Sequence, residues 1–247
     1  MSLAAQLLSH RQGHEIALHA HAQGQLTVVL GGTANIYNDQ GWWLATPGTA
    51  IWVPPEVRHR ASYREQADVI NLLIGIEADD ELARRCCLVL VSGLLRELAR
   101  EAARLVTADA PQVSGAIKAL ILSQLRANTV VSLLHIPEGQ DKRLRQVTTR
   151  LRADPSIAAD LETLASQAFT SPRTLARLFL NETGMTFGQW RERLRVVVAI
   201  DRLLAGQPVT STALDVGYQS ASAFTAAFTR VMGMPPRKYL AQLSRQR

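Results

Sequence analysis

Hydrophobic residues follow two different patterns along the chain, and the pattern changes near residue 79. Before that point, short β-favouring runs at 25–30, 50–53 and 69–76 are separated by Gly and Pro residues, which end strands and form turns. After it, Leu, Ala and Arg recur at the three- and four-residue spacing of helices. The first pattern predicts an antiparallel sandwich or barrel between about residues 15 and 76.

The helical part predicts two helices at 81–106 and 112–125, a linker near 135–141, and further helices joined by short turns. The predicted fold class is therefore α+β, with a β-barrel domain at 1–78, a helical region at 79–138 and an all-α domain at 139–247. We expect the helical region to form a homodimer, because it carries more apolar residues than a small barrel needs for cover. The alternative is that these residues only pack on the barrel; they include Leu88, Val91, Leu95 and Leu98.

Charge is distributed unevenly between the two parts. Residues 1–140 carry 11 Lys and Arg against 13 Asp and Glu, whereas residues 141–247 carry 16 against 8. The net charges are −2 and +8, so the C-terminal part is expected to bind a polyanion, unless it is only a solvated basic surface.

The cysteines and the absence of long apolar runs bear on the compartment. Cys86 and Cys87 are adjacent and lack the spacing of a metal or redox motif, so we expect two small core residues in a reducing compartment. No apolar run of about 18 residues and no signal peptide are present, which predicts a cytoplasmic protein without a membrane segment.

The basic part contains an internal repeat with an offset of 49 positions. In each copy a serine precedes an expected helix as its N-cap, and a glycine ends that helix. A short apolar helix and a tight turn come before each serine, which is the helix-turn-helix pattern. The matching residues are Ser171, Leu175, Phe179, Gly184 and Met185 in the first copy, and Ser220, Phe224, Phe228, Gly233 and Met234 in the second.

The helical period predicts which side chains of each second helix face outward. In the first copy these include Arg173, Ala176 and Arg177, and the two arginines could grip guanine in one major groove of double-stranded DNA. In the second copy the outward face holds Ala221, Ser222, Thr225 and Ala226, with no Arg or Lys. The alternative to DNA binding is a plain helical bundle in which the serines are only caps.

The stretch 161–239 resembles the DNA-binding domain of the AraC/XylS family. The resemblance rests on Arg173-Thr-Leu-Ala-Arg-Leu-Phe, Glu182-Thr-Gly-Met, Val216-Gly-Tyr and Gly233-Met-Pro-Pro with Tyr239. It implies that both units bind one stretch of DNA, with the outward residues of each second helix facing the bases and Ser171 and Ser220 at the helix starts. Because the second set is less polar than is usual in the family, the second unit would mainly bind phosphates through Arg230, Arg237 and Lys238.

The N-terminal part holds a group of histidines. Strand alternation places His19 and His21 on one side of a strand, with Gln25 further along that face. His59 could complete a three-nitrogen site for zinc, nickel, iron or manganese. The alternative is a metal-free pocket in which the histidines hydrogen-bond one another or a small-molecule effector.

The spacing of this group resembles the two cupin motifs, with Gly13, His19, His21, Gln25 and Gly32 in the first and Gly48, Pro54 and His59 in the second. Gln25 replaces the usual glutamate and Glu56 replaces a glycine. Loss of the anionic ligand weakens the expected affinity for a metal.

The whole chain resembles AraC-type regulators with a cupin-like sensor, the subgroup that includes the nitroimidazole-responsive regulator. The segments Ile51-Trp-Val-Pro-Pro and Asp141-Lys-Arg-Leu also match, so the likeness covers the whole chain and not only its two ends. It implies an effector-responsive transcription regulator that controls an efflux transporter, with RNA polymerase as a further candidate partner. The competing interpretations are a metal-dependent cupin enzyme with an appended DNA-binding domain, and a DNA-binding protein whose barrel only dimerises; no acid–base constellation supports the enzyme.

Overall fold

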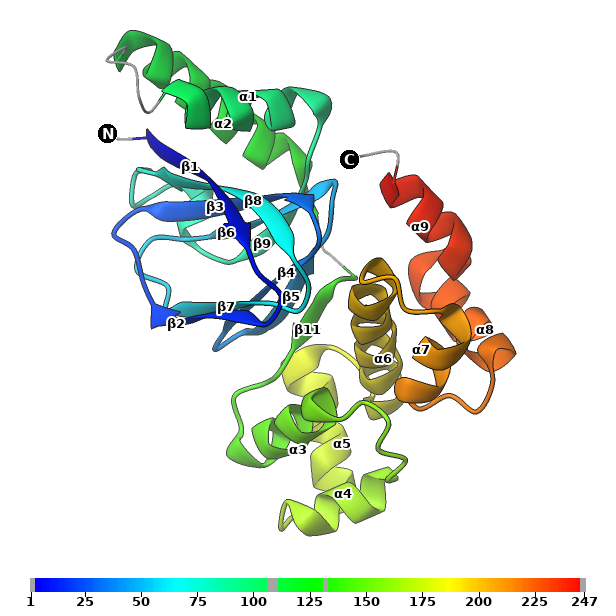
Figure 1. Cartoon of the computed structure of the whole chain (residues 1–247). Coiled ribbons are helices and arrows are strands. Elements are labelled where there is room, and N and C mark those ends of the chain that lie inside the picture. Colours follow the sequence, from blue (N-terminus) through cyan, green and yellow to red (C-terminus); the bar gives the residue numbers. More distant parts are fainter. Residues whose placement is uncertain (1–2, 106–110, 131–132, 245–247) are drawn as a thin grey trace. The chain divides into compact units, whose positions relative to one another are not determined.

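The computed structural model describes residues 3–105, 111–130 and 133–244, in two compact units (Figure 1). The first unit covers most of residues 3–130, and the second covers residues 39–42 and 133–242. Residues 79–130 thus belong to the same unit as the strands that precede them. No helix of the described residues is both long and apolar enough to span a membrane.

The strands are antiparallel and form two sheets; all of them belong to the first unit except residues 41–42 and the strand at 135–137 (Figure 1). The sheet orders are β1-β8-β3-β6-β9-β10 and β11-β5-β4-β7-β2. The strands are β1 (Leu3–His10), β2 (His14–His19), β3 (Gly24–Gly31), β4 (Ala34–Asn38), β5 (Gly41–Ala45), β6 (Thr49–Val53), β7 (His59–Tyr63), β8 (Ala67–Ile74), β9 (Cys87–Leu90), β10 (Thr129–Val130) and β11 (His135–Pro137). The runs expected at 25–30, 50–53 and 69–76 are confirmed as β3, β6 and β8.

Alternation along β3 and β8 separates a helix-covered face from a cavity face. Leu26, Ile70 and Leu72 pack with the helices α1 (Gly93–Leu105) and α2 (Pro111–Asn128) in one buried cluster. The intervening residues, including Gln25 and Asn71, point to the opposite side, where a cavity lies. The helices therefore bury one face of this sheet, and the other face borders the cavity.

The prediction of a single helix at 81–106 is wrong. The chain instead forms a short 3-10 helix (Glu81–Ala83), then β9, and only then α1; Val106 lies outside the described residues. Cys87–Leu90 pairs antiparallel with β6, so tertiary pairing decides the conformation of a run whose apolar pattern fits either element. Cys86 and Cys87 are buried, as expected, and form no disulfide within the described residues; burial raises the pKa of Cys86 to about 12.

One strand at the start was also missed. The sequence of β1, LAAQLLSH, favours a helix by composition, yet it pairs with β8 along its whole length. Pairing with a distant strand therefore overrides local preference in β1. The adjoining β2 pairs with β7 and begins within one residue of the expected boundary near residue 15. The expectation that His19, His21 and Gln25 share one strand is wrong, because β2 ends at His19, His21 lies in the following loop and Gln25 lies on β3.

The second unit is helical and contains the repeated pairs. Its helices are α3 (Lys142–Ala153), α4 (Leu161–Gln167), α5 (Pro172–Thr183), α6 (Phe187–Leu204), α7 (Val209–Asp215), α8 (Ala221–Met232) and α9 (Pro236–Ser244). Pairs α4–α5 and α7–α8 are the two expected helix-turn-helix units, and the long helix between them is α6 (Figure 1). Part of the expected linker, His135–Pro137, forms β11 instead.

The caps expected from the repeat are confirmed in both copies. Ser171 accepts a hydrogen bond from the backbone N–H of Thr174, and Ser220 accepts one from that of Ala223. Gly184 and Gly233 end α5 and α8 with φ of 70° and 74°, a conformation that glycine adopts without strain. The boundaries of both second helices are therefore encoded locally.

Glu182 joins the end of α5 to the start of α3. Its Oε2 accepts hydrogen bonds from the backbone N–H groups of Gln140 (2.5 Å) and Asp141 (3.0 Å), just before α3 begins. A Cβ on the preceding Gly139 would lie 2.3 Å from Leu144 Cδ2 and 2.9 Å from Glu182 Oε2. Glycine at 139 therefore allows this close approach.

We expect Glu182→Ala to destabilise the start of α3 by about 1 kcal/mol, because two backbone donors lose their acceptor and water replaces it in part. The measurement is hydrogen exchange of the amides at 140–145 in the full chain, together with its thermal unfolding. Glu162→Ala, which removes an exposed carboxylate from α4, is the control. Equal exchange in the two variants would show that the Glu182 bonds contribute nothing.

Candidate DNA-binding surface and sensor cavity

The outward face of α5 carries two free arginines. Leu175 and Phe179 are fully buried, which turns Arg173 and Arg177 outward on the opposite side, where both are exposed. Neither arginine has a hydrogen bond or ion pair with another described residue. Ala176 lies between them and is exposed too, so this face can approach a DNA groove with both guanidinium groups unoccupied.

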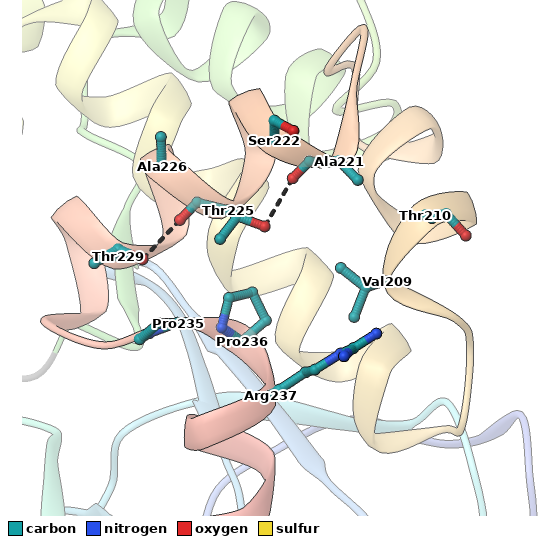
Figure 2. Close-up of a pocket in the computed structure, with 10 residues that line it drawn as sticks. All are labelled: Val209, Thr210, Ala221, Ser222, Thr225, Ala226, Thr229, Pro235, Pro236 and Arg237. Carbon is teal, nitrogen blue, oxygen red and sulfur yellow. Dashed lines mark hydrogen bonds between the residues drawn. The ribbon is translucent and has the colours of Figure 1, made fainter.

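The equivalent face of α8 has a different chemistry. Phe224, Ala227 and Phe228 are buried, and the expected outward residues lie on the other side of the helix. A groove of about 730 Å³ runs along this side (Figure 2). Its walls come from α8, the start of α7 and the start of α9; they are Val209, Thr210, Ala221, Ser222, Thr225, Ala226, Thr229, Pro235, Pro236 and Arg237.

The three cations expected near phosphates differ in their surroundings. Arg230 forms an ion pair with Glu192 of α6, with Nη2 2.5 Å from Oε1, and this pairing raises the pKa of Arg230. Arg237 and Lys238 are exposed and have no partner among the described residues. The region around α8 and α9 therefore offers a phosphate two uncommitted cations, Arg237 and Lys238, whereas Arg230 also ties α8 to α6.

In the first unit, the structure brings together the three histidines that the sequence singled out. His19 ends β2 and lies directly opposite His59, the first residue of β7, while His21 follows in the loop after β2. One ring nitrogen from each lies within 4.8 Å of the others. The neighbouring Glu56 has φ of 60°, a conformation that suits glycine, which is the residue of the cupin motif at this position.

Hydrogen bonds select the ring tautomers of two of these histidines. His19 Nδ1 lies 2.7 Å from the carbonyl oxygen of Ala17, and His59 Nδ1 lies 2.9 Å from that of Val57. A carbonyl only accepts, so each Nδ1 carries the proton and each neutral ring has its lone pair on Nε2. Backbone carbonyls orient metal-binding histidines in this way.

Burial disfavours the charged form of His21 and His59. Desolvation lowers the pKa of His59 to about 4, and it also lowers the pKa of His21. His59 Nε2 is buried without a hydrogen-bond partner in the described part of the chain, which is a costly arrangement for a polar atom. A neutral nitrogen of this kind fits either a metal ion or a hydrogen-bond donor of a ligand.

Through His21, the histidine cluster adjoins a cavity of about 450 Å³ on the face of the β1-β8-β3 sheet that the helices do not cover. Gln25 contacts His21 through a side-chain hydrogen bond and donates from Nε2 to Thr27 Oγ1 (3.0 Å). Thr27 donates in turn to Asn71 Oδ1 (2.8 Å). The lining residues are Ala4, Ala5, Gln6, Leu8, His21, Gln25, Asn71 and Leu73.

Sequence reasoning missed Gln6 and Asn71 as cavity residues, although it found His21 and Gln25. Alternation along β8 would place Asn71 on the unburied side, but nothing local shows that β1 pairs beside it. Because Gln6 lies opposite Asn71 across β1 and β8, recognition of β1 was the signal required.

Two family models match successive parts of the chain. A model of the AraC-like ligand-binding domain matches residues 7–125, and a model of a helix-turn-helix domain matches residues 164–242. These ranges contain the histidine cluster and both repeated helix pairs, respectively.

The chain is also similar to known regulators. It is 29% identical over 228 residues to the HTH-type transcriptional regulator NimR of Escherichia coli, covering 92% of this chain and 83% of that protein. It is 36% identical over 104 residues to the HTH-type transcriptional regulator RipA of Corynebacterium diphtheriae, covering 42% of this chain and 30% of that protein. The crystal structure of ToxT from Vibrio cholerae aligns with a TM-score of 0.43 at 13% identity, covering 98% of each chain.

The two domain matches occur in the same order as the barrel and the paired helix-turn-helix units, and the regulator from Escherichia coli aligns across nearly the whole chain. The chain belongs to the AraC family of transcription regulators, with an AraC-like ligand-binding domain followed by a helix-turn-helix DNA-binding domain.

Proposed function

We propose that an effector bound beside the histidine cluster controls how this regulator binds DNA, and that the effector site includes a divalent metal ion. The observation that carries the proposal is the convergence of three imidazoles beside a cavity. His19, His21 and His59 would each supply one nitrogen, and Gln25 would supply a weak amide oxygen. An effector controls DNA binding only if it binds one conformational state better than the other.

The donor set favours some metals over others. Three imidazoles suit zinc and nickel, whereas manganese prefers carboxylate ligands, which Gln25 does not provide. Iron would also accept the three imidazoles as ligands. The competing possibility is a metal-free cavity in which the buried lone pair on His59 Nε2 accepts a hydrogen bond from a small polar effector.

An enzymatic role has less support from the same cavity. The side chains that line it are apolar or neutral, with His21 as the one titratable group in that set. General acid–base chemistry commonly uses a second positioned group. A metal-dependent cupin enzyme would be recognised by turnover, whereas a regulator binds its effector unchanged.

We further propose a homodimer formed through α2. Leu88 and Leu95 are fully buried in the core of the first unit, and Val91 and Leu98 pack against that core. The apolar residues that the sequence suggested for a dimer interface therefore do not form an exposed stripe. An exposed stripe with alternating three- and four-residue spacing lies on α2 instead. It consists of Val113, Ala116, Leu120, Ser123 and Ala127, and it carries no charge.

On DNA, α5 is the principal reader of base sequence in this proposal. Arg173 and Arg177 can each form a bidentate pair with guanine in one major groove, because both are exposed and unpaired. RNA polymerase would be a further partner of the bound regulator.

We expect Arg173→Ala and Arg177→Ala each to weaken binding to the preferred operator by about 1–3 kcal/mol, with a much smaller loss on random DNA. The operator is first selected from a random duplex library, and affinities are then measured by fluorescence anisotropy at one salt concentration. Arg84→Ala, an exposed arginine of the first unit, is the control. Equal losses on operator and random DNA would identify the two arginines as phosphate contacts.

Metal content tests the histidine site directly. Protein purified without an immobilised-metal step should contain about one zinc or nickel ion per chain, and His21→Ala and His59→Ala should lose it. His14→Ala, outside the cluster, should retain it. Acidification toward pH 4, the value to which burial lowers the pKa of His59, should release the metal as the imidazoles take up protons.

If the parent protein contains no stoichiometric metal, and added zinc, nickel or manganese neither binds tightly nor changes operator affinity, the metal proposal is wrong. The cavity would then hold a metal-free effector. Assignment to the family does not depend on this result.

We expect Leu120→Glu to convert the dimer to a monomer, since two copies of the α2 stripe would bring like charges into an apolar interface. Light scattering at micromolar concentration measures the mass. Ala119→Glu adds the same charge to an exposed position about 100° away around the helix and should leave the dimer intact. A monomeric parent protein would refute the proposal.

A further inference from the structure

The outward face of α8 presents small, uncharged side chains at positions where α5 presents arginines. With the repeat offset of 49, Arg173 corresponds to Ser222 and Arg177 corresponds to Ala226. Ser222 and Ala226 are exposed, and both lie in the groove wall. The α7–α8 pair therefore has the same framework as the α4–α5 pair but lacks the arginines that could bind guanine.

The threonines of this face have their hydroxyl groups engaged with the helix. Thr225 Oγ1 donates to the carbonyl oxygen of Ala221 (2.7 Å), and Thr229 Oγ1 donates to that of Thr225 (2.7 Å) (Figure 2). A hydroxyl proton used in this way is not available to a base. The γ-methyl group of each threonine, rather than its hydroxyl donor, is then free to contact a ligand.

The surroundings of the groove fit DNA rather than an apolar ligand alone. Pro235 and Pro236 extend the apolar wall beside Thr225, and Arg237 stands in the wall at the start of α9 (Figure 2). Lys238 follows Arg237 and is exposed without a partner among the described residues. Cations beside an apolar strip match the arrangement of DNA, in which phosphates flank the base edges of the major groove.

In the major groove, thymine carries the one apolar group among the four bases, its C5 methyl, and alanine and threonine methyl groups contact it. We propose that α8 reads thymine methyl groups through Thr225 and Ala226. The α7–α8 helix-turn-helix pair would then select thymine at defined positions of the second half-site, which is the part of the operator that this pair contacts. Arg237 and Lys238 contact the adjacent phosphates. This inference rests on DNA binding by both helix pairs of the family.

The test replaces each thymine of the second half-site by deoxyuridine, one at a time, in the selected operator. This change removes the C5 methyl and leaves every hydrogen-bonding group in place. We expect about a fourfold loss of affinity at one or two positions, the effect of withdrawing one buried methyl group from an apolar contact. Thymines outside both half-sites should tolerate the same replacement.

A double-mutant cycle assigns the contact to a side chain. Thr225→Ser keeps the hydroxyl that bonds to Ala221 and removes only the methyl group, and Ala226→Gly removes the other methyl. At the matching thymine, one of these variants should bind the thymine and deoxyuridine operators with nearly equal affinity. Arg173→Ala should weaken binding to both operators and leave their affinity ratio unchanged, and circular dichroism checks that each variant is folded.

Three results would overturn the inference in distinguishable ways. A selection that yields no preferred sequence would refute sequence-specific DNA binding and the inference together. A preferred operator on which every deoxyuridine replacement in the second half-site is neutral would refute the inference alone, and the groove would then be a docking site for a protein. Sensitivity to deoxyuridine that neither variant changes would assign methyl recognition to other residues.

Discussion

Burial of Phe179 and Phe228 at equivalent positions of α5 and α8 is the constraint on which the DNA-binding half depends. Both rings are fully buried, and a helix of 3.6 residues per turn that fixes one face in a core must turn the opposite face outward. Phe179 also packs against Trp190 of α6, with ring centroids 5.5 Å apart. The indole N–H of Trp190 donates to the carbonyl oxygen of Pro137 (2.7 Å), so the same core also holds the start of the second unit.

The sensor half follows from alternation in one sheet in the same way. Leu26 and Ile70 enter the core beneath α1 and α2, and this leaves Gln25, Thr27 and Asn71 on the cavity side, where they satisfy one another in a chain of hydrogen bonds. The histidines lack such mutual satisfaction, because His59 Nε2 is buried without a partner in the described residues. A bound metal ion or hydrogen-bond donor, as we propose, would offset the energetic cost of that atom.

The sequence predicted those features that local patterns encode and missed those that depend on distant pairing. Ser171, Ser220, Gly184 and Gly233 act on helices beside them in the chain, so the repeated units could be placed to within a residue or two. The run at 87–90 became a strand because β6 pairs with it, and β1 formed because β8 was available. The histidine motif was visible from its spacing, whereas Gln6 and Asn71 became cavity residues only through the β1–β8 register. The ion pair between Arg230 and Glu192 joins residues 38 positions apart and had no sequence signal.

The two helix pairs keep one framework, and we propose that they contribute to DNA binding through different kinds of contact. The guanidinium groups on α5 would form charge-assisted hydrogen bonds with the bases. Any contact that they make with phosphates would release counterions, so its contribution to affinity would fall as the salt concentration rises. The methyl-bearing face of α8 contributes through apolar contact, which salt hardly screens, while Arg237 and Lys238 supply its charge at the edge. A protein with a duplicated core and two such faces can therefore select guanine in one part of its operator and thymine in the other. Neither face needs any change in the buried residues that hold both helices in place.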